Sequence, residues 1–254
     1  MSVLAIIQAR MGSSRLPGKV MMPIEGKPLI WHVHRRVSAA AACDQAVIAT
    51  GSRAGNAEMA SFLESQDIPI FCGSDDDVLD RYVSAARYFG ATAIVRITGD
   101  CPMIDPDVID EVVSFFNNGS YDYVSNVHPP TYPDGLDVEV MRPDALERAH
   151  HEARLESERE HVTPYIWNHP ERFALGNISS SNDLSDRRWI VDDARDLEFA
   201  RAVFRDLNPR NSMFRMNDVL DFLAERPEIM RINAGTARNE GYQASLRHDR
   251  IVSP

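Results

Sequence analysis

Cysteine is scarce in this chain of 254 residues, with only Cys43, Cys72 and Cys101. The three stand far apart, without a CxxC pair or a Cys/His spacing, which argues against a structural zinc site. A small, odd number of cysteines is typical of proteins from a reducing compartment, so we expect a cytoplasmic location.

Long apolar runs are also lacking. No stretch reaches the roughly 18 apolar residues that a membrane-spanning helix needs. The N-terminus has no basic segment followed by a long apolar run, so we expect no secretory signal peptide. We therefore predict no membrane partner.

Positive charge is in deficit, since 27 Lys and Arg residues face 38 Asp and Glu residues and the net charge is -11. General nucleic-acid binders usually carry a basic face, so we expect no nucleic-acid partner. The exception is local, because Arg10, Arg15 and Lys19 precede the first acidic residue, Glu25. Such a cluster suits a small polyanionic ligand.

The first part of the chain alternates short apolar runs with helical patterns. The composition, 44% hydrophobic and 26% charged, is that of a globular protein long enough to bury a large core. Alternating strands and helices predict βαβ units, and hence an α/β fold with three layers and a mostly parallel sheet. The expected strands are 3–7, 44–50, 68–71 and 93–97, and the expected helices are 29–42, 56–65, 77–89 and 106–116.

The regular alternation of strands and helices ends after residue 120. Three further runs indicate strands in a different arrangement, with a polar helix between the last two. The apolar run 189–191 predicts a return to the main sheet, and the tail 233–254 is polar and poorly periodic. The expected elements are strands 121–125, 137–141 and 173–178, and helices 143–156, 194–204 and 216–225.

The segment 8–19, which reads QARMGSSRLPGK, follows the first expected strand. It therefore lies at a carboxyl end of the sheet, where open α/β folds bind ligands. Its glycines let the backbone approach phosphate oxygens, and its arginines and lysine supply positive charge. Neither GxxxxGK[ST] nor GxGxxG is present, and the absence of the second argues against a dehydrogenase. A polyphosphate site is the stronger interpretation, and a solvated basic turn is the alternative.

Segment 9–19 resembles the nucleotide-binding signature of the cytidylyltransferases that activate acidic sugars, such as CMP-Kdo and CMP-sialate synthetases. The branch typified by spore coat polysaccharide biosynthesis protein F is the most similar. The resemblance continues in order through most of the chain. Its further motifs are Gly73-Ser74 with 77–82, 98–102, 134–139, 159–165, 188–192 with 196–198, and 239–242.

The resemblance implies transfer of a nucleotidyl group from CTP with release of pyrophosphate. Lys19 is then expected to stabilise charge on the transferring phosphate, while Arg10 and Arg15 hold the outer phosphates. Arg81 either lies near the nucleotide or pairs with Asp77 on an exposed helix face. The expected nucleotide-binding residues are Ala9, Arg10, Gly12, Ser13, Ser14, Arg15, Lys19, Gly73, Ser74 and Arg81.

The resemblance also implies a metal site, with Asp100 and Asp192 as ligands of Mg²⁺. Mg²⁺ takes a few carboxylates together with phosphate oxygens and water. Asp100 follows a strand and a Thr-Gly turn, although a turn or capping role is the alternative. Asp193 is the other candidate at the second position, or a helix N-terminal residue favoured by the dipole. We count Lys19, Arg10, Arg15 and Asp100 as the catalytic candidates.

The acceptor side is less constrained. Asp137 and Glu139 alternate with apolar residues, so both carboxylates share one strand face. They orient a sugar hydroxyl, act as a base or join the metal site, or simply form a polar face. Arg159 either meets a substrate carboxylate or pairs with a neighbouring glutamate. His161 is a further substrate candidate, and both it and His128 have a structural or exposed role as the alternative.

We therefore predict one nucleotidyltransferase domain, 1–254, with an inserted substrate and dimerisation subregion at about 120–187. Its expected partners are CTP, a small acidic sugar of the Kdo or nonulosonate type, and a second copy in a homodimer. Surface polysaccharide biosynthesis is the expected process. Use of GTP, a non-sugar or phosphonate acceptor, and a non-catalytic nucleotide-sugar binding protein are the alternatives.

Overall fold

The computed structural model describes residues 2–236 and 238–252. Within them a seven-stranded sheet has the order β5-β4-β1-β6-β8-β7-β9. Strands β5, β4, β1 and β6 are mutually parallel, and β8 is antiparallel to both β6 and β7. The strands are β1 (Val3–Gln8), β4 (Gln45–Thr50), β5 (Ile70–Cys72), β6 (Ala93–Thr98), β7 (Tyr123–Ser125), β8 (Glu139–Met141) and β9 (Leu175–Asn177).

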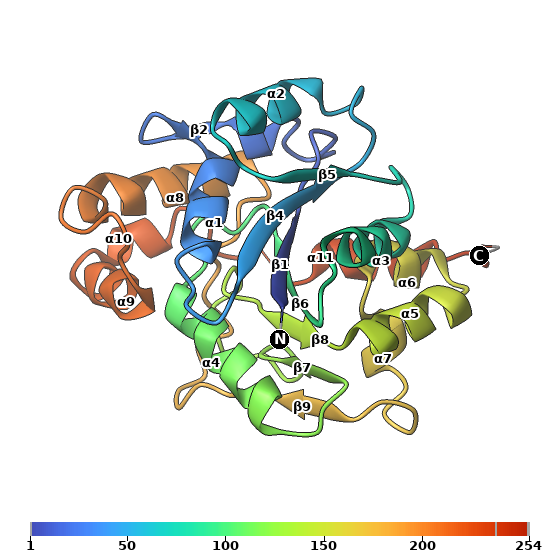
Figure 1. Ribbon diagram of the computed structural model, residues 1–254. Coiled ribbons are helices and arrows are strands. Elements are labelled where there is room, and N and C mark those ends of the chain that lie inside the picture. Colours follow the sequence, from blue (N-terminus) through green and yellow to red (C-terminus); the bar gives the residue numbers. More distant parts are fainter. Residues whose placement is uncertain (1, 237, 253–254) are drawn as a thin grey trace.

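Helices cover both faces of this sheet (Figure 1). One face packs against α1 (Leu29–Val37), α2 (Ala57–Ser65), α4 (Pro106–Asn118), α8 (Ala194–Leu207) and α9 (Met216–Glu225). The other packs against α3 (Val78–Phe89), α5 (Pro143–Glu152) and α7 (Pro164–Trp167). The remaining helices are η1 (Lys19–Met21), α6 (Glu156–His161), α10 (Pro227–Met230) and α11 (Glu240–Arg247).

Strand β1 shows why this sheet lies in the middle of the fold. Its apolar residues alternate between the two faces: Ala5 packs in one core and Ile6 in the other, and both are fully buried. A strand covered on both sides needs apolar residues at consecutive positions, which is typical of parallel sheets. The predicted three-layer α/β fold with a mostly parallel sheet is confirmed.

Most predicted elements are present with small shifts at their ends, but three differ. The first helix ends at Val37, and the expected polar helix 143–156 ends at Glu152 (α5), with a separate helix, α6, beginning at Glu156. These separate because the Glu158 carboxylate accepts hydrogen bonds from the backbone N–H groups of Arg154 and Leu155, which starts a new helix. The third difference is 189–191, which is not a strand. Its Val191 N–H bonds the carbonyl of Asp100, so a loop and not a strand is its partner.

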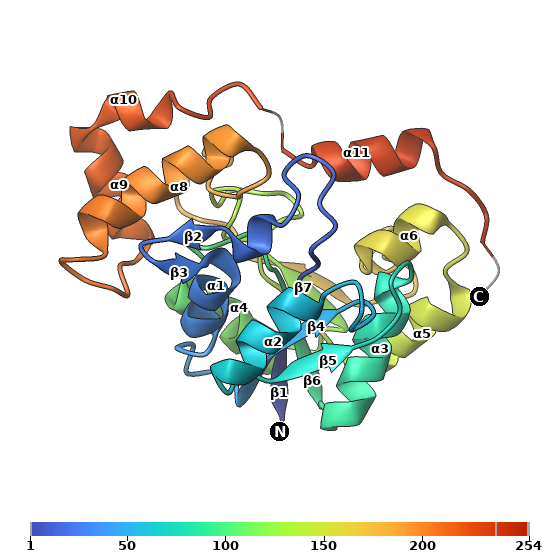
Figure 2. The same ribbon diagram turned by 90° about the horizontal axis from the view of Figure 1, so that it is seen from above.

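The elements that were not predicted are a small hairpin, the short helices η1, α7 and α10, and helix α11. Residues Pro23–Ile24 (β2) and Lys27–Pro28 (β3) form a small hairpin, with Glu25 and Gly26 at positive φ in its turn. Helix α11 lies in the polar tail, and it packs beside α6 at the edge that carries the N-terminal loop (Figure 2). Among the described residues, none of the helices is both long and apolar enough to span a bilayer.

Candidate active site

The loop after β1 closes on itself and places Lys19 inward. The Gly18 N–H donates to the Met11 carbonyl, and Gly18 adopts φ 70°, where glycine has no steric penalty. Lys19 then starts the short helix η1 and is only 8% exposed. A buried lysine needs a partner for its charge, and this one has two.

Lys19 joins the two aspartates predicted for the metal. Its Nζ lies 2.7 Å from Asp100 Oδ2, 2.7 Å from Asp192 Oδ1 and 2.9 Å from the Val191 carbonyl oxygen. Lys19 and Asp100 are 81 positions apart in the chain, and Lys19 and Asp192 are 173 apart. The fold therefore brings three predicted residues together at the carboxyl edge of β1 and β6.

Gly99 explains how Asp100 reaches this point. A Cβ atom at Gly99 would lie 2.8 Å from the Gln8 carbonyl oxygen and 2.9 Å from the Ala9 Cβ, so a side chain would push the two strand ends apart. The Gly99 N–H also donates to that same Gln8 oxygen. The Thr-Gly turn thus holds Asp100 against the N-terminal loop.

The charges of this group reinforce one another. Burial alone would lower the pKa of Lys19, but the charges of Asp100 and Asp192 outweigh it and the pKa is raised. Burial would raise the pKa of Asp100, but attraction to Lys19 outweighs it and the pKa is lowered. Both groups are therefore ionised at neutral pH.

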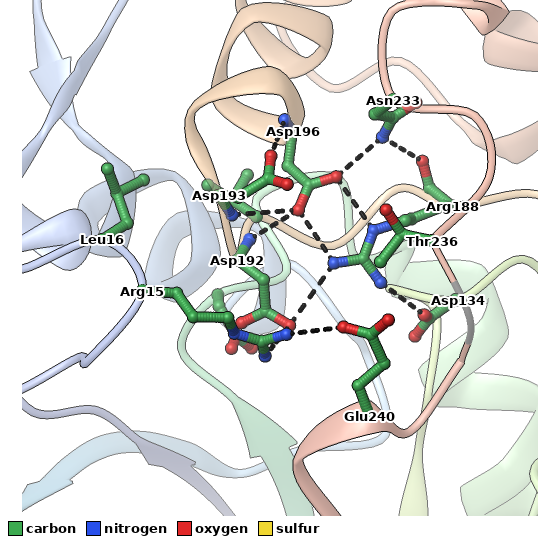
Figure 3. Close-up of polar contacts among 12 residues, drawn as sticks. Arg15, Leu16, Asp134, Arg188, Asp192, Asp193, Asp196, Asn233, Thr236 and Glu240 are labelled. Atoms are coloured by element: carbon green, nitrogen blue, oxygen red, sulfur yellow. Dashed lines mark hydrogen bonds and ion pairs between the residues drawn. The ribbon is translucent and has the colours of Figure 1, made fainter.

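Arg15 approaches Asp192 from the solvent side (Figure 3). Its guanidinium lies 2.7 Å from Asp192 Oδ2 and 3.0 Å from Glu240 Oε2, on α11. Arg10 is more exposed, with its guanidinium 3.9 Å from Glu160. Both arginines are accessible to a ligand, and Arg15 is shared between Asp192 and Glu240.

Asp192 is positioned by a second cluster behind it. Asp196 is fully buried, and one of its oxygens accepts from the backbone N–H groups of Asp192 and Asp193. Arg188 donates to both oxygens of Asp196, at 2.8 and 2.9 Å, and lies 3.5 Å from Asp192 (Figure 3). Asp193 is the N-cap of α8, so its predicted alternative role at the helix terminus is the one seen here.

The loop 73–76 is shaped by Arg81. Arg81 is 2% exposed and donates to the carbonyl oxygens of Ser74 and Asp75. The alternative of an exposed helix residue paired with Asp77 is therefore wrong. Ser74 Oγ accepts from the Asp77 N–H at 3.1 Å, which fixes the turn into α3. Gly73 allows this packing, since a Cβ there would lie 3.0 Å from the Arg81 side chain.

The acceptor candidates have different surroundings. Asp137 pairs with Arg238, and burial raises the pKa of Asp137 although Arg238 opposes the shift. Glu139 pairs with Arg96, and that charge holds the pKa of Glu139 below its usual value despite burial. Glu139 begins β8 and accepts from the hydroxyl of Thr163 at the start of α7, whereas Asp137 lies before the strand, and each has a basic partner that the sequence did not reveal.

Arg159 does not face the site as predicted. It is 5% exposed, its Nε lies 2.7 Å from Asp77 Oδ2, and it donates to the carbonyl oxygen of His150. Its ion-pair partner is Asp77 and not a neighbouring glutamate, so it ties α6 to the start of α3. His161 does lie near the loop, where its Nε2 is 3.0 Å from Ser245 Oγ on α11.

Several residues at this edge were missed by sequence reasoning. Arg238 and Glu240 belong to a tail with little periodicity, and Arg96 lies within an apolar strand pattern. Only the similarity of 239–242 to a family motif pointed to that tail. Arg96 and Arg238 lie outside every quoted motif, whereas Asp134, Arg188, Asp196 and Glu240 lie within quoted motifs that had been given no role for them.

The donor set suits Mg²⁺ bound together with a nucleotide. Across residues 2–236 and 238–252, no cluster of three or more Asp, Glu, His or Cys side chains could hold a metal. Mg²⁺, however, is commonly held by one or two carboxylates plus phosphate oxygens and water. Asp100 and Asp192 reach the same nitrogen of Lys19, so both carboxylates could reach one cation.

A cationic loop facing two carboxylates, at the carboxyl edge of a mostly parallel sheet, defines the class of this protein: it is a nucleotidyltransferase. More specifically, the chain belongs to the cytidylyltransferase family, whose model matches residues 4–226. The family predicted from the sequence motifs is thus confirmed.

Individual relatives agree. The chain is 31% identical to the spore coat polysaccharide biosynthesis protein SpsF of Bacillus subtilis over 235 residues, 89% of this chain and 95% of SpsF. It is 35% identical over 118 residues to a 3-deoxy-manno-octulosonate cytidylyltransferase of Trichlorobacter lovleyi, 46% of this chain and 45% of that enzyme. A cytidylyltransferase structure from Leptospira borgpetersenii superimposes with a TM-score of 0.87 at 28% identity, covering 93% of this chain and 100% of that one.

Proposed function

We propose that this enzyme transfers CMP from CTP to a hydroxyl group of a small acidic sugar, with Mg²⁺, and releases pyrophosphate. The acceptor is a sugar acid of the Kdo or nonulosonate type, used for a surface polysaccharide. One observation carries the proposal: Lys19 Nζ lies between Asp100 and Asp192 while Arg15 approaches from solvent. The partial similarity to an octulosonate cytidylyltransferase supports the choice of acceptor.

The basic residues would counter the charge of the triphosphate. Attack on the α-phosphorus requires that its surrounding negative charge be neutralised, and fixed cations do this without reorganising. Lys19 would donate to the α-phosphate region, and Arg10 and Arg15 to the outer phosphates. Ser13 and Ser14, with loop N–H groups, would add hydrogen bonds, and the loop of Gly73 and Ser74 would border the base and ribose.

Asp100 and Asp192 would hold the Mg²⁺. When bound, the ion supplies a Lewis acid that withdraws charge from the phosphate oxygens. Arg188 and Asp196 would keep Asp192 oriented, because they restrain its backbone and carboxylate. Asp137, whose pKa is raised by burial, is suited to accept a proton from the acceptor hydroxyl.

Pyrophosphate release is the direct test. Purified enzyme is assayed with Mg²⁺, each of the four ribonucleotides, and a panel of sugar acids that includes 3-deoxy-manno-octulosonate. Release is expected with CTP and a sugar acid, and it should be abolished in Asp100→Asn. Asp186→Asn is the matched control, because that side chain is 75% exposed and, within the described residues, pairs with its neighbour Arg187 alone. No release with any pair would refute the proposal.

The proposal also includes the oligomeric state and the cellular location. We expect a homodimer that uses the subregion 120–187, and a cytoplasmic location. Light scattering of the purified chain measures the first, and fractionation of producing cells measures the second.

A further inference from the structure

A cavity outside the nucleotide residues lies over β7 and β9. It measures about 290 Å³ and is lined by Tyr123, His128, Trp167, Leu175, Gly176 and Asn177. This volume is close to the lower end of the range for small-molecule sites, roughly 300–1,000 Å³. Since β8 is antiparallel to both β6 and β7, β7 ends at the same sheet edge as β6, the strand that carries Asp100.

A row of four rings connects this cavity with the nucleotide loop. The ring centroids are 4.6 Å apart for His128 and Trp167, 5.7 Å for Trp167 and Tyr242, and 5.1 Å for Tyr242 and His161. We call these four residues the aromatic row. His161 lies beside Glu160, whose carboxylate is 3.9 Å from the guanidinium of Arg10. The row thus runs from the cavity to the predicted phosphate-binding loop.

The rings come from separate parts of the chain. His128 follows β7, Trp167 ends α7, His161 ends α6 and Tyr242 lies on α11. Trp167 and His161 are only half-buried, so these rings are not interior core residues. Aromatic rings with an apolar face and a polar edge are favoured where a ligand offers both kinds of surface.

Backbone strain fixes one end of the row. Val162 has φ 73° and ψ -54°, a region that β-branched residues rarely occupy, and it is fully buried. The Thr163 N–H bonds the His161 carbonyl across it at 2.9 Å. The turn places His161 in the row and lets the Thr163 hydroxyl donate to Glu139 at 2.7 Å. Strained backbone of this kind clusters at functional sites.

Polar groups beside the row suit a carboxylated ligand. Tyr123, in the cavity wall, donates its hydroxyl to Glu139, which pairs with Arg96. Within the described residues, the Nε atoms of Arg96 and Arg238 are buried and have no hydrogen-bond partner. Two guanidinium groups thus lie beside the row, and a guanidinium charge favours a carboxylate nearby.

We propose that the aromatic row and this cavity form the acceptor subsite, in which a sugar acid lies with the C–H face of its ring against Trp167. This rests on the proposed cytidylyl transfer and assigns its acceptor specificity to Trp167. The row runs from the cavity, past the face that carries Glu139, to Glu160 beside Arg10, so an acceptor bound along it lies at the sheet edge that carries the N-terminal loop.

The first test measures binding without turnover. Tryptophan emission is recorded while 3-deoxy-manno-octulosonate or glucuronate is added together with Mg²⁺ and a non-hydrolysable CTP analogue. The emission of the wild type and of Trp31→Phe should change on addition, whereas that of Trp167→Phe should not. Trp31 is the matched control, because it is also half-buried but lies on α1, on the other face of the sheet. Methyl glucoside, which lacks a carboxylate, should have no effect.

The second test separates this inference from the proposed function. Trp167→Ala should raise the KM for the sugar acid roughly tenfold, as loss of a ring contact implies, and leave the KM for CTP unchanged. Trp167→Phe should restore most of the affinity. Pyrophosphate release by the wild type with an unchanged acceptor KM in Trp167→Ala would overturn the subsite alone. No release by the wild type would overturn the transfer reaction, and no Trp167-dependent response to either sugar acid would overturn the subsite.

Discussion

Replacing Lys19 by Met tests the centre of the site. The change keeps a long side chain but removes the ammonium group that lies 2.7 Å from both Asp100 and Asp192. Two largely buried carboxylates then face each other without a cation. Removing one partner of a buried ion pair typically costs 3–5 kcal/mol, so we expect the free energy of unfolding to fall by about that amount without Mg²⁺.

Mg²⁺ should recover part of this loss, since the two carboxylates can share the ion and a ligand that binds only the folded state stabilises it. Urea denaturation with and without Mg²⁺ measures this, and the stabilisation by Mg²⁺ should be larger in Lys19→Met than in the wild type. If Lys19 also stabilises the transferring phosphate, kcat should fall by roughly 10²–10³-fold.

Lys27→Met is the matched control, because Lys27 is an exposed lysine of the β2–β3 hairpin. It should change neither the unfolding midpoint by much nor kcat. An unfolding midpoint for Lys19→Met equal to that of the wild type, or an unchanged kcat, would show that the ion pairs described here do not carry the charge balance of the site.

Three further changes test separate features. Glu240→Gln should tighten CTP binding up to about fivefold, since it frees Arg15 from an exposed ion pair worth about 1 kcal/mol or less, and calorimetric titration measures it. Asp134→Asn should remove a pH dependence of the free energy of unfolding. Burial, with repulsion from Asp137, raises the pKa of Asp134 to about 7 in the folded state. The folded state is therefore favoured by the protonated carboxyl below about pH 4, and this stability is lost as the pH rises through about 7. Glu25→Asn should stabilise the chain by roughly 0.5–1 kcal/mol, because Glu25 has φ 45° in a two-residue hairpin turn that favours Asn followed by Gly.

Each has its own decisive outcome. Weaker CTP binding in Glu240→Gln would mean that Glu240 assists the nucleotide and does not compete with it. For Asp134→Asn, the free energy of unfolding in urea is measured at about pH 5 and about pH 8. If it falls between the two pH values as much as in the wild type, Asp134 is not the source of the pH dependence. An unchanged or lower midpoint in Glu25→Asn would mean that the hairpin turn is not strained.

The sequence by itself determined the central strand of the sheet and the cationic loop that follows it. The continuous apolar run of β1 predicts a doubly covered strand, because every side chain there must be buried. Arg10, Arg15 and Lys19 then follow within one turn-rich segment, so their proximity needs no tertiary information. The Thr-Gly turn before Asp100 and the capping role of Asp193 are local features as well, and local patterns are readable from neighbouring residues.

Only the tertiary structure decided which charges meet. Lys19 lies between Asp100 and Asp192 because two loops distant in sequence end at one sheet edge. The same long-range packing took Arg159 away from the acceptor side and paired it with Asp77. Helix α11 was not predicted; none of its residues is buried, and its contacts are with α6 and, through Glu240, with Arg15 of the N-terminal loop. Pairing across such separations depends on how the layers pack, which no local pattern encodes.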